Sequence, residues 1–258
     1  MKTERIMYNF ELEQIINNEL QISRYRDYAP NGLQVQGRKQ VNKIVTGVTA
    51  CQLLLDKAVE LKADAVLVHH GYFWKSEPQI ITGIKYQRIK TLLTNDINLY
   101  GYHLPLDGHP VLGNNIELAN LLGISIDKRN DITDLLFTGI LNTPLTALQF
   151  KLQLEQVLHN NQQQVLFCGD NAPQVINRIA WCSGGGQDYI EQAALMGVDA
   201  FFTGEVSERT IHIAREYGIN FYAAGHHATE RYGIKKLGEW LASCYGVEVI
   251  FVDIDNPV

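Results

Sequence analysis

The sequence predicts an α/β protein made of two related α/β domains, because short apolar strands alternate with helices twice along the chain. Residues 43–50, 52–63 and 64–71 have the patterns of a strand, a helix and a second strand. Residues 178–201 follow the same order. Strands joined by crossover helices are parallel, and ligands of such sheets bind beyond the carboxyl ends of the strands. We therefore expect functional residues where these strands end.

The remaining elements follow from the same patterns. Apolar residues between Phe10 and Leu20 have helical spacing, and residues 29–32 are typical of a turn. A helix followed by a strand is predicted for residues 86–107 and again for residues 208–230. Residues 145–164, between the two halves, have a helical pattern that ends in a polar cluster.

The two halves align with each other without a gap. Five aligned pairs are identical: Ile44 with Ile179, Gln52 with Gln187, Ala58 with Ala193, Asp64 with Asp199, and Ala65 with Ala200. We interpret the repeat as an internal duplication. The predicted first domain comprises residues 1–128 and 222–258, and the predicted second domain comprises residues 129–221.

Composition narrows the class of protein. Hydrophobic residues make up 46% and charged residues 19% of the chain, which argues against disorder. A net charge of −6 gives no general attraction to nucleic acid or to an anionic membrane. The chain has no long apolar run and its first residues do not resemble a signal peptide, so we expect a cytoplasmic protein without a membrane partner. Its four cysteines lack the CxxC spacing of a thiolate zinc site.

Six of the eight histidines lie in three short clusters, each directly after a predicted strand: His69 with His70, His103 with His109, and His226 with His227. Asp107 follows His103 by four residues, and Glu230 follows His226 by the same interval. Imidazole and carboxylate groups suit Zn, Mn, Fe or Ni, and more than four candidate ligands favour two ions over one. An alternative interpretation without metal makes His226 or His227 a general base oriented by Glu230.

Two further motifs have open interpretations. Ser183 and the glycines Gly184, Gly185 and Gly186 lie between a strand and a helix, where backbone N–H groups can bind a phosphate or form a tight turn. The aromatic residues that follow His70 can stack on a base or pack within the protein, and packing is the better supported interpretation.

Longer motifs carry a family resemblance. Residues 27–37, 68–74, 102–115, 182–186, 203–208 and 225–231 resemble the YbgI-type, NIF-three-like dinuclear metal proteins, also named GTP cyclohydrolase 1 type 2 homologues. The resemblance covers essentially the whole chain. It implies two divalent ions in a cleft between two α/β domains, and a homohexamer. The ligands implied are His69, His70, Asp107, His226 and Glu230, with His103 close to the ions.

We therefore expect a metal-dependent hydrolase that acts on a nucleotide-like or phosphorylated small molecule, with a GTP cyclohydrolase type of reaction implied by the resemblance. His103 and His227 are the candidates for proton transfer near neutral pH. Ser183 and Gly184–Gly186 are the candidates for binding a substrate phosphate. Two other classes stay open: a metal-handling protein or metallochaperone without catalysis, and a ring around nucleic acid, which the acidic balance disfavours.

Overall fold

The computed structural model describes residues 6–127, 131, 133–159 and 162–258. The chain divides into two compact units, which we call unit 1 and unit 2. Unit 1 comprises Met1–Leu106 and Gly233–Asp255, and unit 2 comprises Asp107–Tyr232 and Asn256–Val258. The predicted domain boundary between residues 128 and 129 lies outside the described residues.

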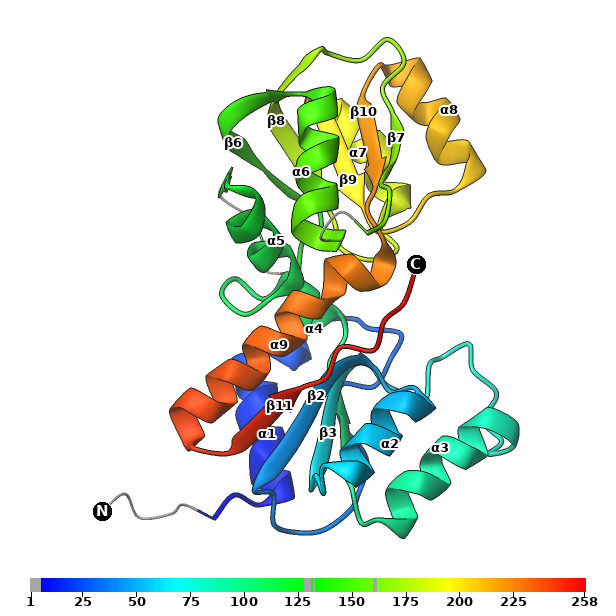
Figure 1. The fold of residues 1–258 in the computed structure, drawn as a ribbon, viewed down its shortest axis with the longest axis vertical. Coiled ribbons are helices and arrows are strands. Elements are labelled where there is room, and N and C mark those ends of the chain that lie inside the picture. Colours follow the sequence, from blue (N-terminus) through cyan, green and yellow to red (C-terminus); the bar gives the residue numbers. More distant parts are fainter. Residues whose placement is uncertain (1–5, 128–130, 132, 160–161) are drawn as a thin grey trace. The chain divides into compact units, whose positions relative to one another are not determined.

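Unit 1 contains a five-stranded sheet with the strand order β1-β4-β3-β2-β11. Strand β1 is antiparallel to β4, and the other neighbours are parallel. In Figure 1, α2 and α3 lie on one face of this sheet and α1 lies on the other. The elements are α1 (Asn9–Glu19), β1 (Gly32–Val35), β2 (Lys43–Thr49), α2 (Gln52–Glu60), β3 (Ala65–His70), α3 (Gly83–Thr94), β4 (Asn98–Gly101) and β11 (Glu248–Phe251), with a short 3-10 turn at Ile22–Arg24.

The core of unit 1 explains this arrangement. Val66 and Val68 of β3 pack with Leu54 of α2 and Leu92 of α3 on one face of the sheet. On α1, Leu12 and Ile16 are fully buried. The hydroxyl of Tyr100 in β4 donates a hydrogen bond to the carbonyl of Asn9 at 2.9 Å, which ties α1 to the sheet. The sheet is thus covered on both faces, as expected for parallel strands.

Unit 2 contains a six-stranded sheet with the order β5-β6-β8-β9-β10-β7. Strands β8, β9 and β10 are parallel, whereas β5, β6 and β7 pair antiparallel. The elements are α5 (Asn114–Leu122), β5 (Ile124–Ile126), β6 (Phe137–Thr146), α6 (Ala147–His159), β7 (Leu166–Cys168), β8 (Val175–Trp181), the 3-10 turn Gln187–Tyr189, α7 (Ile190–Leu195), β9 (Ala200–Thr203), α8 (Glu208–Tyr217) and β10 (Asn220–Ala223). Two further helices, α4 (Leu104–Gly108) and α9 (His226–Tyr245), contain the points at which the units are divided.

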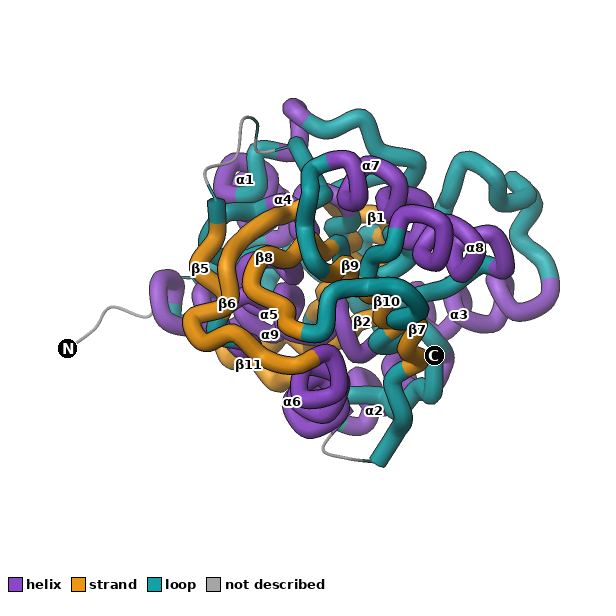
Figure 2. The backbone as a smooth tube through the Cα atoms, turned by 90° about the horizontal axis from the view of Figure 1, so that it is seen from above, coloured by secondary structure: helices purple, strands orange, loops and turns teal. Residues whose placement is uncertain are grey.

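Alternate residues of the unit 2 strands point to opposite layers. Trp181, Phe202 and Tyr222 pack with α5 and α6, whereas Phe201 and Phe221 pack with α7 and α8. Figure 2 shows α6 on one side of these strands and α7 and α8 on the other. Both faces of the central strands are therefore buried.

The two units share the order β-α-β-α-β, in β2 to β4 of unit 1 and in β8 to β10 of unit 2. Corresponding polar residues make corresponding hydrogen bonds. Asp64 accepts from the backbone N–H groups of residues 42 and 43, and Asp199 accepts from those of residues 177 and 178. Asn98 donates to the carbonyl of Asp64, and Asn220 to that of Asp199, both at 3.1 Å. These contacts are consistent with a repeated unit; the duplication itself stays a prediction.

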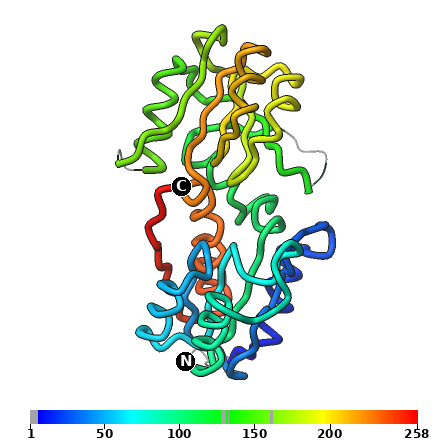
Figure 3. Tube along the Cα trace, turned by 90° about the vertical axis from the view of Figure 1, so that its right-hand side faces the viewer, coloured from blue at the N-terminus to red at the C-terminus, as the bar shows by residue number. Residues whose placement is uncertain are grey.

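The C-terminal part of the chain completes unit 1. Figure 3, coloured by residue number, shows the orange to red residues returning among the blue to cyan residues of unit 1. There β11 pairs parallel with β2, and the absence of a side chain at Gly238 in α9 leaves room for Val249 and Thr46. Among the described residues, no helix combines the length and apolar character needed to cross a membrane.

Candidate metal centre

Three histidines of unit 1 lie together at the carboxyl ends of two adjacent parallel strands. His69 and His70 end β3, and His103 follows β4. One ring nitrogen from each of the three lies within 4.8 Å of the others. The predicted convergence of strand ends is therefore observed for His69, His70 and His103. The group includes His103, which sequence analysis considered mainly for proton transfer, so His103 is a candidate ligand as well.

Each of the three rings has a hydrogen bond that orients it. His69 Nδ1 lies 2.8 Å from the carbonyl oxygen of Tyr102, and His103 Nδ1 lies 2.9 Å from Asp27 Oδ1. A carbonyl or carboxylate oxygen only accepts, so Nδ1 of each of these two rings donates its proton, and Nε2 has a free lone pair whenever the ring is neutral. His70 Nδ1 lies 3.1 Å from the hydroxyl of Thr49. Such contacts on the far nitrogen are typical of histidines that bind metal.

Asp27 organises the loop beside His103. Its carboxylate also accepts hydrogen bonds from the backbone N–H of Leu104 at 2.9 Å and from the amide of Asn31 at 3.0 Å. Burial by itself raises the pKa of Asp27, but the hydrogen bond and positive charge of His103 outweigh it and lower the pKa to about 2. Asp27 is therefore ionised at neutral pH and fixes the orientation of His103.

In unit 2, Asp107 lies on α4 and is 4% exposed. Its Oδ1 accepts hydrogen bonds from the amide of Asn114 and from the hydroxyl of Ser183, both at 2.9 Å. The backbone N–H of Ser183 in turn donates to Asn115 at 2.9 Å. Asp107 is thus a buried carboxylate whose direction is set by Asn114 and Ser183.

His226 begins α9 and lies between two carboxylates of unit 2. Its Nε2 is 2.9 Å from Glu230 Oε2, and its Nδ1 is 2.7 Å from Glu205 Oε1. Glu230 follows by one helical turn, so both side chains lie on the same face of α9. Burial alone lowers the pKa of His226, but the hydrogen bonds and charges of Glu230 and Glu205 raise it to about 9. The two carboxylates therefore favour the protonated form of the His226 ring.

The glycine loop of unit 2 makes room for these side chains. Gly184 has a φ of +60°, and a Cβ there would collide with Glu230 Oε1 and lie 3.0 Å from His226 Nε2. The N–H groups of Gly184 and Gly186 donate to Thr229 and Thr203, at 2.9 and 3.0 Å. The loop thus supports the His226–Glu230 pair, and its binding of a phosphate stays a prediction.

The other predicted residues have different surroundings. His227 is buried, and its backbone N–H donates to the carbonyl of Val258 at 2.9 Å. His109 Nδ1 accepts from the backbone N–H of Leu112 at 3.0 Å, which fits a structural role. Cys182 is buried near the unit 2 carboxylates; burial, with the charges of Asp107 and Glu230, raises the pKa of its thiol. Among the described residues, Cys182 belongs to none of the groups of side chains that could hold a metal ion.

Sequence reasoning missed Asp27 and did not assign a role to Glu205. Each holds Nδ1 of a histidine, at 2.9 and 2.7 Å. Asp27 lies in a turn-like stretch rather than after a strand, and its partner is 76 residues away. The available signal was the Asp-x-Ala-Pro-Asn pattern, in which Asp commonly accepts hydrogen bonds from nearby backbone.

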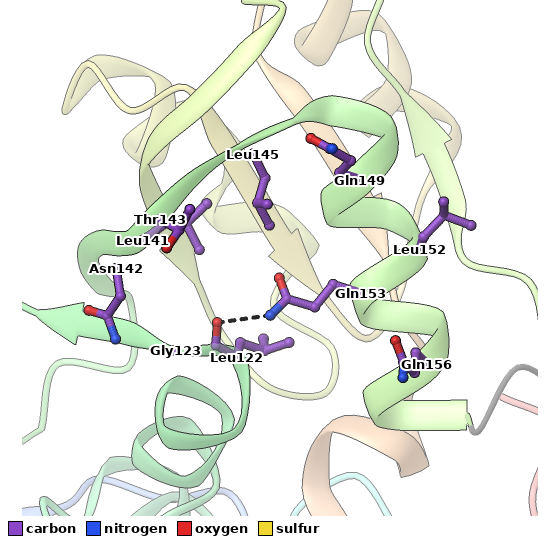
Figure 4. Close-up of a pocket in the computed structure, with 10 residues that line it drawn as sticks. All are labelled: Leu122, Gly123, Leu141, Asn142, Thr143, Leu145, Gln149, Leu152, Gln153 and Gln156. Atoms are coloured by element: carbon purple, nitrogen blue, oxygen red, sulfur yellow. Dashed lines mark hydrogen bonds between the residues drawn. The ribbon is translucent and has the colours of Figure 1, made fainter.

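Unit 2 also contains a cavity of about 350 Å³ next to α6. Figure 4 shows its lining, in which Gln153 donates a hydrogen bond to the carbonyl of Leu122 at 3.2 Å. The lining residues are leucines, a glycine and uncharged Asn, Thr and Gln side chains. They offer neither imidazole nor carboxylate, so this cavity is not a metal site.

The donor sets of both units fit divalent cations. Unit 1 supplies three imidazoles, and unit 2 supplies Asp107, Glu230 and His226. The absence of a side chain at Gly184 accommodates the Glu230 carboxylate, because a Cβ there would collide with it. Imidazole and carboxylate together suit zinc, manganese, iron and nickel.

Residues 7–257 match the sequence model of the Duf34/NIF3 family (NGG1p interacting factor 3). A Yersinia pestis protein named "GTP cyclohydrolase 1 type 2 homolog" is 62% identical over 251 residues, which cover 97% of this chain and 100% of that protein. An Escherichia coli K12 protein of the same name is 58% identical over 251 residues, with the same coverage.

Solved structures share the fold. The structure of a protein described as ybgI, of unknown function, has 57% sequence identity and a TM-score of 0.94, and the match covers 98% of this chain and 100% of that one. The crystal structure of a Thermus thermophilus protein has 32% identity and a TM-score of 0.87, with the same coverage. The mixed α/β architecture with two sheets is therefore common to these proteins.

Proposed function

Because the chain belongs to the Duf34/NIF3 family, we propose that it binds two divalent metal ions and acts as a metal-dependent hydrolase of small molecules. The observation that carries the proposal is that two histidines each have a carboxylate hydrogen-bonded to Nδ1. Asp27 contacts His103 in unit 1, and Glu205 contacts His226 in unit 2. A carboxylate on the far nitrogen orients an imidazole and raises its basicity as a ligand.

The proposed ligands are His69, His70, Asp107, His226 and Glu230. They are the residues implied by the family resemblance, and each has the donor chemistry that zinc, manganese, iron or nickel requires. We propose that these five residues hold the two ions. His103 either completes this set or moves a proton beside it, and His227 stays a candidate for proton transfer.

Bound divalent ions would supply Lewis acidity and make a nearby water more acidic. The chain's own residues then have distinct tasks. Asp27 keeps the proton of His103 on Nδ1, so that Nε2 can accept a proton from water or give one to a leaving group. Asn114 and Ser183 hold the Asp107 carboxylate in a fixed direction, and the Gly184 turn leaves space beside Glu230.

The substrate class that we propose is based on the name of the relatives. Their name, "GTP cyclohydrolase 1 type 2 homolog", supports a nucleotide-like or phosphorylated molecule. Ser183 and Gly184–Gly186 are the residues proposed to meet a phosphate. The homohexamer implied by the resemblance is a further proposal, and light scattering on the purified protein tests it.

Activity is tested with the purified, metal-loaded full chain on a panel of nucleotides, phosphoesters and amides. We expect turnover of at least one class, its loss after treatment with a chelator, and its recovery when a divalent ion is restored. His70→Ala should lack this activity, whereas His212→Ala serves as a control, because His212 pairs with Glu208 on the surface of α8. Two bound ions without turnover across the panel would contradict the hydrolase and favour a metal-handling protein. Rapid transfer of the ions to a competing chelator would strengthen that second conclusion.

A further inference from the structure

Two aromatic side chains of unit 1 lie beside the histidine group. The ring of Trp74 is 4.9 Å from that of His103 and 6.0 Å from that of His70, measured between centroids. The ring of Tyr28 is 5.0 Å from His103 and 6.0 Å from Trp74. We call Tyr28 and Trp74 the aromatic ledge. It adjoins two of the three histidines that are candidates for metal binding or proton transfer.

The loops that carry the ledge are tied to each other. The backbone N–H of Lys75 donates to the carbonyl of Tyr28 at 2.9 Å, and the ammonium group of Lys75 donates to the carbonyl of Asp27 at 2.5 Å. The indole N–H of Trp74 donates to the carbonyl of Gly71 at 3.2 Å. The ledge is thus held in place by hydrogen bonds that fix both loops before any ligand arrives.

The backbone before Trp74 is strained. Phe73 has a φ of +65°, a left-handed conformation that is unfavourable for a bulky residue. The carboxylate of Glu77 stabilises it by accepting from the N–H groups of Phe73 and Trp74, at 2.7 and 3.2 Å. Strain of this kind persists where the surrounding structure imposes it, and it is concentrated at functional sites. Here it lies in the residue directly before Trp74.

The aromatic residues next to Trp74 in sequence pack in the core that contains α2 and α3, whereas the two ledge residues do not belong to this core. Tyr72 and Phe73 pack against the core cluster that contains α2 and α3, and this cluster includes neither Tyr28 nor Trp74. Tyr28 is 53% exposed. A large aromatic side chain that stays exposed beside polar site residues is available for contact with a ligand.

We propose that the aromatic ledge binds a planar heteroaromatic ring of the substrate, such as a purine, by stacking. The proposal rests on the proposed function, because it names the substrate class of the same site. Aromatic side chains stack on heteroaromatic rings through their π faces, with little dependence on the substituents of the ring. A ring on this ledge would lie next to the His103 ring, which contacts both aromatic side chains. The substrate would then be recognised by its ring rather than by a phosphate alone.

The test measures binding of guanosine, as a planar purine probe, and of ribose 5-phosphate, which has no aromatic ring. Calorimetric titrations use the full chain, both metal-loaded and chelator-treated. Two pairs of variants separate stacking from bulk: Tyr28→Phe with Tyr28→Leu, and Trp74→Phe with Trp74→Leu. Phenylalanine keeps an aromatic face, whereas leucine keeps only apolar volume. Circular dichroism and metal analysis accompany each variant.

We expect guanosine to bind more tightly than ribose 5-phosphate, each leucine variant to bind guanosine about tenfold or more weakly, and each phenylalanine variant to stay within about threefold of the original chain. The proposal is overturned if guanosine does not bind, if the leucine variants bind it unchanged, or if the phenylalanine variants lose as much as the leucine variants. Because the titrations include chelator-treated protein, stacking can be observed even if metal binding or turnover fails. The two proposals therefore fail separately.

Discussion

Asp27 and His103 form a buried hydrogen-bonded pair, with Oδ1 of the carboxylate 2.9 Å from Nδ1 of the ring, although 76 residues separate them in sequence. Asp27 comes from the loop before β1, and His103 follows β4, which pairs with β1. The pairing of these two strands therefore brings a carboxylate to the histidine. The contact fixes the tautomer of His103, on which its proposed role depends.

Asp27→Asn should destabilise the protein in a pH-dependent way. Folding lowers the pKa of Asp27 from 3.8 to about 2. The ionised carboxylate therefore stabilises the folded protein at pH values above the unfolded pKa. This stabilisation is lost as the pH falls through the folded pKa. A shift of this size corresponds to about 2 kcal/mol. Urea unfolding should show a gap between the original chain and Asp27→Asn that is full at pH 7 and shrinks from about pH 5 toward pH 2. Asp56→Asn, at an exposed position, should show no such gap. A gap that does not change with pH would contradict the ionic role of Asp27.

Glu205→Gln should weaken metal binding without unfolding unit 2. Removing a carboxylate that orients a metal-binding histidine typically costs ten- to a hundredfold in affinity. The matched control is Glu208→Gln, because Glu208 pairs with His212 at 2.8 Å on an exposed helix face and has the same chemistry away from the site. Titration with zinc in a competing chelator measures both variants. Equal affinities for the two would show that Glu205 does not orient a ligand.

Gly184→Ala should remove metal from the protein. The new methyl group would collide with the Glu230 carboxylate and approach His226, and the backbone is left-handed at φ +60°. Gly197→Ala is the control: Gly197 has a similar φ of +68°, but nothing lies within 4 Å of its added Cβ. Backbone strain of roughly 1 to 3 kcal/mol is then common to both. Thermal unfolding should show similar losses of stability from strain, while metal content should fall in Gly184→Ala alone. A Gly184→Ala protein with full metal content would contradict the proposal that metal binding depends on the absence of a side chain at this position.

Sequence patterns were sufficient for the parallel strands of the two repeated segments, β2 to β4 and β8 to β10, and for the histidines that follow them. The apolar run of β3 ends at His69 and His70, and that of β10 ends shortly before His226. These strands could be predicted because apolar patterns and strand ends are local features of the sequence. The helix predicted in residues 145–164 corresponds to α6, Ala147–His159.

Strands β1, β5, β6, β7 and β11 were not predicted. Strand β6 contains Asn142 and Pro144 in a stretch where its pairing with β8 is irregular, and such residues lower any strand propensity. Strand β11 is only four residues long and is fixed by its pairing with β2. The roles of Asp27 and Glu205 likewise depend on contacts between distant segments, which no local pattern contains.

The central claim is that two divalent ions are held by five residues, His69, His70, Asp107, His226 and Glu230, and metal stoichiometry tests it most directly. Elemental analysis should be carried out on the purified full chain, on His70→Ala and Glu230→Gln, and on His212→Ala as the control. We predict two divalent ions per chain in the original and control proteins, and a loss of at least one ion in each of the other two variants. A chain that binds no ions, or variants that keep both, would contradict the claim.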